Sequence, residues 1–289
     1  MLNIYEQINH NKWQSVLIIS IFIGFVVFAA YAIGYAFNIR ELLPLAIIFS
    51  IFSSGASYFW GDKIVLSLNG ARPASRKEFF DFYTVTENLS QVAKIPVPKI
   101  FVIDSPAMNA FATGRDPKNS VVCATTGLLS KLNRTELEGV VAHELAHIKN
   151  YDIRLMTIVS ILVGTLSILI NMSWHARSGN NDNKGNNALM IVGIILIIFA
   201  PLIAQLIQLA ISRRREYFAD SSSAMLTRQP SGLISALKKL DADSTPQEFA
   251  STATASLYIS NPFKGNKLAS MFSTHPPVAD RIKALEGAM

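Results

Sequence analysis

The sequence predicts a mostly helical α+β protein with four transmembrane helices. Three observations favour this class. Hydrophobic residues make up 50% and charged residues only 16% of the 289 residues, whereas soluble domains carry roughly a quarter charged residues. Long charge-free stretches could each cross a bilayer as a helix of about 20 residues. Between them lie short strand-like segments and amphipathic helical segments.

Four stretches without Asp, Glu, Lys or Arg contain long apolar runs. The first run, about residues 16–37, is too long for the apolar region of a signal peptide, and a second run follows almost at once. That second run, 42–60, ends at Trp60, a residue type typical of the membrane interface. The third and fourth runs, 155–172 and 188–211, are more polar, and they could instead be helices buried in a protein core.

Lysine and arginine residues are distributed unevenly among the predicted connections. Segments 38–41 and 174–187 hold few of them, whereas segments 61–153 and 212–289 have basic residues next to the spans. The positive-inside rule therefore predicts that both longer segments and both termini are cytoplasmic. This bias accounts for most of the net charge of +6. Nucleic-acid binding is not expected, because the arginines adjoin spans and are not interleaved with stacking aromatic residues.

The segment between the second and third runs contains the predicted sheet. Residues 75–94 are amphipathic and end before a proline-containing stretch, which indicates a helix. A turn at 114–117 separates two strand-like runs. The predicted strands are 99–103, 109–113 and 120–124, and a short helix is expected over 126–132.

The C-terminal part predicts further helices over 218–227, 231–240 and 277–285. The single cysteine of the chain, Cys123, lies in the last predicted strand. One cysteine excludes an intrachain disulfide and fits a reducing compartment. In a strand-like run, this side chain is expected to be a small buried hydrophobic group and not a nucleophile.

The most informative motif is H-E-x-x-H, formed by His143, Glu144 and His147. Residues at i and i+4 share one face of a helix, so the two histidines can bind one metal ion. A capping-box pattern over 135–138 predicts that a helix starts there. Catalytic zinc sites combine imidazole ligands with one position left open for water. Glu144 lies where a carboxylate can act as the general base toward that water.

A catalytic zinc site needs a third protein ligand, commonly a carboxylate from a second helix. Glu216 and Asp220 are spaced at i and i+4 just after the fourth apolar run, so both face one side of a helix. Glu216 can ligate a metal, and Asp220 can accept a hydrogen bond from a ligand histidine. Spacing alone leaves open the alternative that Glu216 pairs with the arginines at 213–215.

Three motifs, in this order, resemble those of the HtpX family of bacterial membrane zinc metallopeptidases, which are related to the Ste24 CAAX proteases. They are H-E-L-A-H-I-K-N-Y-D from His143, R-R-R-E-Y-F-A-D from Arg213, and F-S-T-H-P-P-V-A-D-R-I from Phe272. The resemblance covers almost the whole chain, including the two leading spans. It implies a zincin-like metallopeptidase domain and a place in the bacterial cell (inner) membrane.

The resemblance also assigns the metal site. It implies one zinc ion per subunit, held by His143, His147 and Glu216. Glu144 is then the general base, and Asp220 orients a ligand histidine from behind.

Further residues acquire roles in the same way. The resemblance implies that His275 and Arg281 approach the substrate carbonyl and stabilise its developing negative charge. Without it, the residues around His275 indicate only a turn before a helix. The resemblance also implies a strand that pairs with an extended substrate, although an ordinary sheet edge would have the same sequence. That strand is Asn109, Ala110, Phe111 and Ala112.

The chain is therefore expected to be one catalytic unit interrupted by a membrane hairpin. Residues 1–60 form a first membrane hairpin, and 61–153 form the first catalytic segment. A second hairpin, 154–211, contains the polar loop 174–187, and 212–289 complete the catalytic unit.

The expected function is that of a multi-pass, zinc-dependent endopeptidase at the cytoplasmic face, with the lipid bilayer and membrane-protein or peptide substrates as partners. The resemblance implies misfolded or damaged membrane proteins as substrates, hence protein quality control. One alternative is the processing of a specific membrane-anchored or lipidated peptide. Another is a non-proteolytic membrane scaffold or chaperone with a zinc-stabilised fold, which has no use for Glu144. The sequence does not indicate which oligomeric state the protein adopts.

Overall fold

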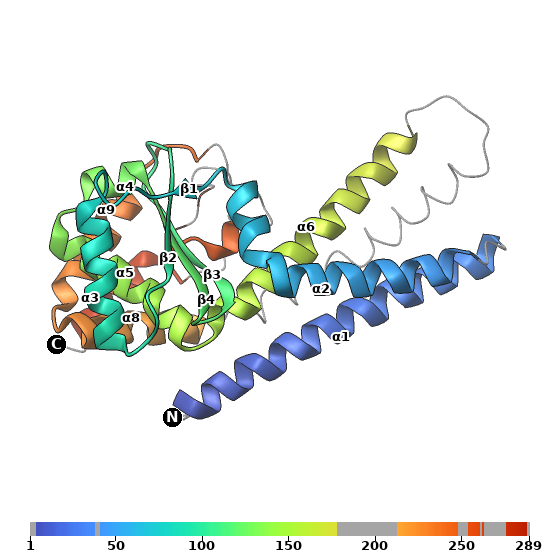
Figure 1. Ribbon diagram of the computed structural model, residues 1–289, viewed down its shortest axis with the longest axis horizontal. Coiled ribbons are helices and arrows are strands. Elements are labelled where there is room, and N and C mark those ends of the chain that lie inside the picture. Colours follow the sequence, from blue (N-terminus) through green and yellow to red (C-terminus); the bar gives the residue numbers. More distant parts are fainter. Residues whose placement is uncertain are drawn as a thin grey trace.

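Among the described residues, three long helices project as a stalk from a body that contains the sheet (Figure 1). The stalk consists of α1 (Ile4–Phe37), α2 (Leu42–Leu68) and α6 (Asp152–Arg177). The fourth apolar run and His275 lie outside the residues that this computed structural model describes. The described residues are 4–37, 41–177, 213–247, 254–260, 262 and 276–287.

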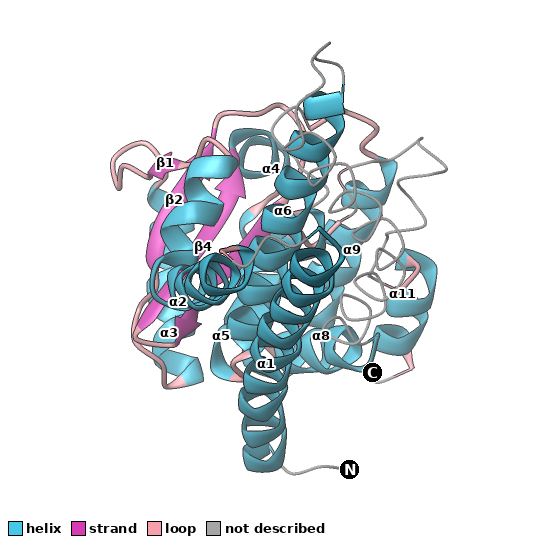
Figure 2. Ribbon diagram, turned by 90° about the vertical axis from the view of Figure 1, so that its right-hand side faces the viewer, coloured by secondary structure: helices cyan, strands magenta, loops and turns pink. Residues whose placement is uncertain are grey.

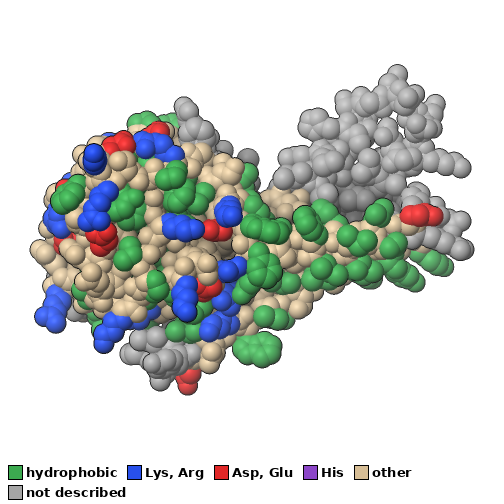
Figure 3. All heavy atoms as spheres, viewed as in Figure 1, with side chains coloured by type: hydrophobic (Ala, Val, Ile, Leu, Met, Phe, Trp, Pro, Cys, Tyr) green, Lys and Arg blue, Asp and Glu red, His purple; other side chains and the backbone are tan. Residues whose placement is uncertain are grey.

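Helices α1 and α2 form an antiparallel hairpin that leaves the body and returns to it (Figure 1). Within the described residues, they contain the two stretches long and apolar enough to cross a membrane, Ile8–Ala32 and Leu43–Leu68. Their outer surface is apolar, and Figure 3 shows hydrophobic side chains along the projecting helices while charged ones gather on the body. Two of the four predicted spans thus correspond to candidate membrane helices. The first candidate starts earlier in the chain than expected.

The third apolar run forms α6, but the first turns of this helix are part of the protein core. Leu155 and Ile158 pack against Ile18 and Phe22 of α1 in one buried cluster. Thr157 lies close to Gly61 of α2, where an added Cβ would come within 2.6 Å of the threonine methyl group. The core-helix alternative therefore applies to the beginning of this run, because α1 and α2 cover it.

The sheet has four strands in the order β1-β2-β4-β3. The predicted strands are confirmed as β2 (Lys99–Ile103), β3 (Ala110–Asp116) and β4 (Asn119–Thr125). β2 and β4 are parallel, and β4 pairs with β3 in antiparallel fashion. β1 (Arg72–Pro73) was not predicted, because two residues carry no periodicity; it pairs with β2. β3 is thus a terminal strand among the described residues.

Helices cover the sheet and fill the rest of the body (Figure 2). The predicted helix 75–94 begins later, at Phe80, because the Ser75 carbonyl accepts the N–H groups of Glu78 and Phe79 in a turn. Lys94, whose φ of 58° is left-handed, ends this helix.

The helices of the body are α3 (Phe80–Ala93), α4 (Thr126–Lys131), α5 (Arg134–Lys149), α8 (Arg213–Thr227), α9 (Pro230–Ala242) and α11 (Val278–Glu286), with a short 3-10 helix η1 (Ala255–Leu257).

Helix α5 is the centre of the body and carries the H-E-x-x-H motif. Its apolar side chains, such as Leu145, share one core with α3, the sheet and α9. Gly139 lets α9 approach closely, since a Cβ there would lie 2.6 Å from the backbone nitrogen of Leu233. On another side, Ser223 of α8 donates a hydrogen bond of 2.7 Å to the Gly139 carbonyl. A helix enclosed in this way holds its side chains in fixed positions.

Candidate active site

Helix α5 begins two residues before the predicted capping box. Asn133 is its N-cap, and the asparagine side chain accepts the Glu136 N–H while the Glu136 side chain accepts the Asn133 N–H. The box is therefore Asn-x-x-Glu and not the Thr-x-x-Glu pattern expected from the sequence. Asparagine caps helices as well as threonine does, so both patterns were available to the same segment.

The side chains of His143, His147 and Glu216 converge on one point. Glu216 comes from α8, which packs along α5. The two Nε2 atoms are 3.2 Å apart, and each lies 3.6 Å from a carboxylate oxygen of Glu216. All three side chains are buried. Among the described residues, this is the group of His, Cys, Asp and Glu whose ligand atoms could hold a metal ion. The structure thus brings together all three predicted ligands.

Carboxylates behind the two histidines fix which ring nitrogen carries the proton. His143 Nδ1 lies 2.9 Å from Asp220 Oδ1, and His147 Nδ1 lies 3.1 Å from Asp152 Oδ2. A protonated Nδ1 in each ring leaves both Nε2 lone pairs facing each other and facing the Glu216 carboxylate. Three converging lone-pair donors repel one another unless a cation lies between them.

Zinc fits this donor set. A tetrahedral zinc ion with bonds of about 2.0–2.2 Å separates neighbouring ligand atoms by about 3.3–3.6 Å, close to the separations of 3.2 and 3.6 Å found here. Two imidazoles and one carboxylate match the ligand set of catalytic zinc peptidase sites. Binding is coupled to proton release: Asp152 and Glu216 outweigh the effect of burial and raise the pKa of His147 to about 9.

Glu144 lies beside this point and is 2% exposed. Burial is the main cause that raises the pKa of its carboxyl to about 7, although the charge of His147 and the Ala112 backbone N–H that it accepts act the other way. A carboxylate with a pKa near neutrality can both accept and return a proton at physiological pH.

Asp220 is held by Arg281 in a buried, two-pronged ion pair. Arg281 is 0% exposed, and its Nε and Nη2 atoms donate to the Asp220 carboxylate at 2.9 and 2.6 Å. The arginine charge outweighs the effect of burial and holds the pKa of Asp220 far below its usual range. Burial, with the Arg281 charge, lowers the pKa of His143 and favours the neutral ring that binds metal.

Arg281 was predicted to stabilise the oxyanion, and the structure places its Nη1 atom 3.8 Å from Oε2 of the ligand Glu216. Its hydrogen bonds to acceptors go to Asp220 and to the Ile259 carbonyl, 3.2 Å away. The oxyanion role of Arg281 stays a prediction, and so does that of His275, which lies outside the described residues.

Asp152, which orients His147, was not singled out from the sequence. On a continuous helix, a residue five positions after His147 would face away from it. The chain breaks between α5 and α6 at Tyr151, whose φ of 62° is left-handed. This turn brings the Asp152 carboxylate back to the ring. The backbone conformation of a single tyrosine cannot be read from spacing, so the sequence did not indicate this contact.

The N-terminal stalk helix also reaches this carboxylate. Asn11 of α1 is 1% exposed, and its amide donates to Asp152 Oδ1 at 2.7 Å and to the Asn150 carbonyl at 2.9 Å. One turn further on, Gln14 accepts a hydrogen bond from Arg215, the neighbour of Glu216. Helix α1 thus contacts the carboxylate partner of His147 and the sequence neighbour of Glu216.

The predicted substrate strand is in place, but its outer edge already has partners. The Ala110 carbonyl accepts the Ile259 N–H at 2.9 Å, and Phe111 pairs with Tyr258. The Asn109 side chain donates to the Ser260 carbonyl at 2.9 Å. Peptide addition along this strand stays a prediction, and over Ala110 it would have to displace contacts within the chain.

The sequence profile and the sequence relatives of this chain point to one family. Residues 77–289 match the sequence profile of peptidase family M48. The chain is 45% identical over 285 residues to a protease HtpX homolog of Dictyoglomus turgidum, covering 97% of this chain and 93% of the relative. It is 40% identical to a protease HtpX homolog of Ligilactobacillus salivarius, covering 98% and 99%. The crystal structure of S. mikatae Ste24p aligns with a TM-score of 0.48 and 20% identity, over 96% of this chain and 65% of that one.

Proposed function

The chain belongs to peptidase family M48 and is a metalloprotease of the HtpX type, and from this premise we propose that it is a zinc-dependent endopeptidase of membrane proteins. The observation that carries the proposal is the convergence of His143, His147 and Glu216 on one buried point beside Glu144. Three ligands and an adjacent carboxylate are what hydrolysis needs, whereas purely structural zinc sites are usually closed by four protein ligands.

The residues of the site have different roles in peptide hydrolysis. A bound zinc ion would supply Lewis acidity, making water nucleophilic near neutral pH and polarising the substrate carbonyl. Glu144 takes the proton of the attacking water and then delivers it to the leaving amine. Asp220 and Asp152 hold the two imidazoles in the tautomer that binds the metal. In this proposal Arg281 keeps Asp220 ionised and in place.

The substrates proposed are misfolded or damaged membrane proteins, cut at the cytoplasmic face. Two contacts support a site close to the bilayer. Asp152 is both the partner of His147 and the first residue of stalk helix α6, and Asn11 of stalk helix α1 binds Asp152. Basic residues flanking the apolar runs favour a cytoplasmic body. The division into segments 1–60, 61–153, 154–211 and 212–289 belongs to the same proposal.

Processing of a specific membrane-anchored or lipidated peptide remains the second candidate. It shares the chemistry and differs in substrate choice. Cleavage of several unrelated, destabilised membrane proteins by the purified enzyme would favour quality control, whereas cleavage of a single anchored peptide would favour processing.

The substitution Glu144→Gln tests the mechanism. It removes the proton acceptor while keeping the size of the side chain and all three metal ligands. We expect zinc to be retained and cleavage of a casein-like unfolded substrate to fall by about 10²–10⁴-fold. Zinc content by atomic absorption and initial rates of the full-length protein in detergent measure the two effects.

The matched control is Glu138→Gln on the same helix. Glu138 is partly exposed and pairs with Arg134 at 3.4 Å, away from the metal ligands. This variant should cleave at the wild-type rate. Wild-type cleavage by Glu144→Gln would refute the proposed base.

A further inference from the structure

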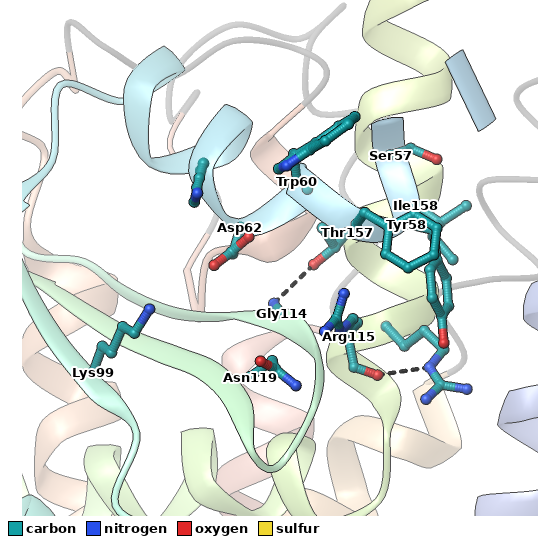
Figure 4. Close-up of a pocket in the computed structure, with 14 residues that line it drawn as sticks. Ser57, Tyr58, Trp60, Asp62, Lys99, Gly114, Arg115, Asn119, Thr157 and Ile158 are labelled. Atoms are coloured by element: carbon teal, nitrogen blue, oxygen red, sulfur yellow. Dashed lines mark hydrogen bonds between the residues drawn. The ribbon is translucent and has the colours of Figure 1, made fainter. Parts of the chain in front are cut away.

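A polar hollow of about 250 Å³ lies where the stalk joins the body, away from the metal ligands. It is bounded by α2, by the start of α6, by the β3–β4 turn and by the first residue of β2 (Figure 4). Figure 4 shows Asp62, Lys99, Arg115 and Asn119 around one common space. The proposed peptidase mechanism uses none of these side chains.

The hollow is strongly basic. Its walls include four cationic side chains and one carboxylate, that of Asp62. Among the described residues, no carboxylate lies within 4 Å of either lysine ammonium or of the Arg154 guanidinium, while Arg115 lies 3.5 Å from Asp116. The cations are Lys63, Lys99, Arg115 and Arg154. The charges of Lys63, Lys99 and Arg154 are therefore available to an anionic ligand.

The two arginines are held in place before any ligand arrives. Arg154 donates to the Arg115 carbonyl at 2.6 Å, and its guanidinium lies 5.5 Å from the ring centre of Tyr58. Arg115 lies 5.5 Å from the ring centre of Phe59. Both arginines are half-buried. Cation–π contacts of this kind orient a guanidinium without neutralising it, so binding costs little side-chain entropy.

The position of the hollow indicates where the anion comes from. Trp60, which is 50% exposed, lies on its rim, and the apolar outer surface of α2 ends there. Asp62 and Lys63 follow directly. Tryptophan at the end of an apolar span is typical of the depth of lipid headgroups. A headgroup in the hollow would have its acyl chains against the exposed side chains of α2, such as Phe52 and Phe59.

We propose that this hollow binds the phosphate of an anionic phospholipid in the leaflet that faces the body. The arginine forks suit phosphate oxygens geometrically, and the two lysines add charge at the mouth. A headgroup held there would join α2 and α6 to the β3–β4 turn. It would set the depth at which the body lies on the membrane.

Lipid selectivity of the full-length protein tests the site. Wild-type protein in detergent is mixed with phosphatidylglycerol or phosphatidylcholine, and bound lipid is counted by native mass spectrometry. We expect retention of phosphatidylglycerol and little phosphatidylcholine. The double variant Lys63→Gln/Lys99→Gln should lose about 30-fold in phosphatidylglycerol affinity, since each basic residue near a membrane surface contributes about a fivefold factor.

Two further variants keep the test specific. Lys238→Gln/Lys283→Gln makes the same change in net charge on exposed helix surfaces of α9 and α11 and should bind like wild type. Lys63→Arg/Lys99→Arg keeps the charge and should retain the lipid. Equal losses in the two glutamine variants would show non-specific attraction and overturn the proposal.

Free glycerol phosphate distinguishes a lipid site from a soluble-phosphate site. It should displace bound phosphatidylglycerol only weakly, because it lacks the acyl chains that contact α2. Displacement at an affinity equal to that of the lipid would overturn the lipid assignment.

Discussion

The two ligand histidines have carboxylate partners with different surroundings. Asp220 is bound by the guanidinium of Arg281 at 2.6 and 2.9 Å. Asp152 has a neutral donor, Asn11, at 2.7 Å and a more distant cation, Arg215, at 3.4 Å. A carboxylate in a close ion pair raises the pKa of its histidine less, because the charge of the nearby cation acts in the opposite direction. His147 is therefore expected to be the more basic ligand.

The substitution Asp152→Asn tests this partner. It keeps the shape of the side chain but removes the charge that supports the His147 ring. We expect zinc affinity to fall about 10–100-fold, measured by competition with a chelator. The control, Asp81→Asn, removes an exposed carboxylate that pairs with Arg134. Unchanged zinc affinity in Asp152→Asn would contradict the assigned role.

Helix α1 contains a candidate membrane span and also contacts the junction between α5 and α6. The side chain of Asn11 is buried against the start of α6, and Lys12 lies 4.5 Å from the ring centre of Tyr151, the residue that redirects the chain. A stalk helix therefore stabilises the junction that brings Asp152 to His147. Small shifts of α1 within the membrane would alter that contact.

The substitution Asn11→Leu should lower zinc affinity, by less than Asp152→Asn does, because it removes only one donor to the carboxylate. Asn9→Leu, at an exposed position of the same helix, is the control and should leave affinity unchanged. In the double variant Asn11→Leu/Asp152→Asn, the two losses should not add, since both act through one carboxylate. Additive losses would place Asn11 outside this network.

The start of α5 makes stability depend on pH. Burial alone would raise the pKa of Glu136, but hydrogen bonds from Lys239, Ser235 and the Asn133 N–H outweigh it and hold the pKa below its ordinary value. A lowered folded-state pKa stabilises the protein above the unfolded value of about 4.3 and loses this effect as the pH falls through the folded value.

Glu136→Gln should therefore lower stability at pH 7 by about 1 kcal/mol, and the gap to wild type should close as the pH falls below about 4. Thermal unfolding of both proteins in detergent micelles at several pH values measures this difference in stability. Glu138→Gln, two residues away, should show no such convergence. A gap that persists unchanged at low pH would contradict the capping role.

Periodicity and motif spacing predicted the elements that depend on local sequence. Strands β2, β3 and β4 and the helical setting of His143 and His147 follow from such patterns. What escaped prediction depends on the backbone path between elements. Asp152 required the left-handed Tyr151, and the contact of Asn11 required α1 to lie along α6. Neither leaves a repeating signal in the sequence.

The whole molecule separates an apolar stalk from a charged body (Figure 3). Exposed side chains of α1 and α2, such as Phe28 and Ile48, need a hydrocarbon environment. The described part of α6 leaves the body in the same direction (Figure 1). If 154–211 form a second hairpin, the loop between its spans lies on the opposite side of the membrane from the metal site.

A cysteine at Asn181 tests this topology, although the residue lies outside the described part of the chain. Cys123 is the single natural cysteine and is buried, so Cys123→Ala provides a background without reactive thiols. We expect a membrane-impermeant maleimide to label Asn181→Cys in intact cells. A cysteine at Lys238, on the surface of α9, should react only after lysis. Protection of Asn181→Cys in intact cells would exclude a spanning hairpin.

Arg281 of α11 follows Asp220 by 61 residues and His143 by 138 residues, so the metal site joins segments that the ribosome makes at different times. Chains begin to fold from the N-terminus while they are made, and here the anchor enters the membrane long before the partner of Asp220 exists. A copy whose synthesis has not reached Arg281 therefore has an incomplete set of groups to orient the zinc ligands. The carboxylate that orients His143 has no guanidinium partner until synthesis has passed residue 281.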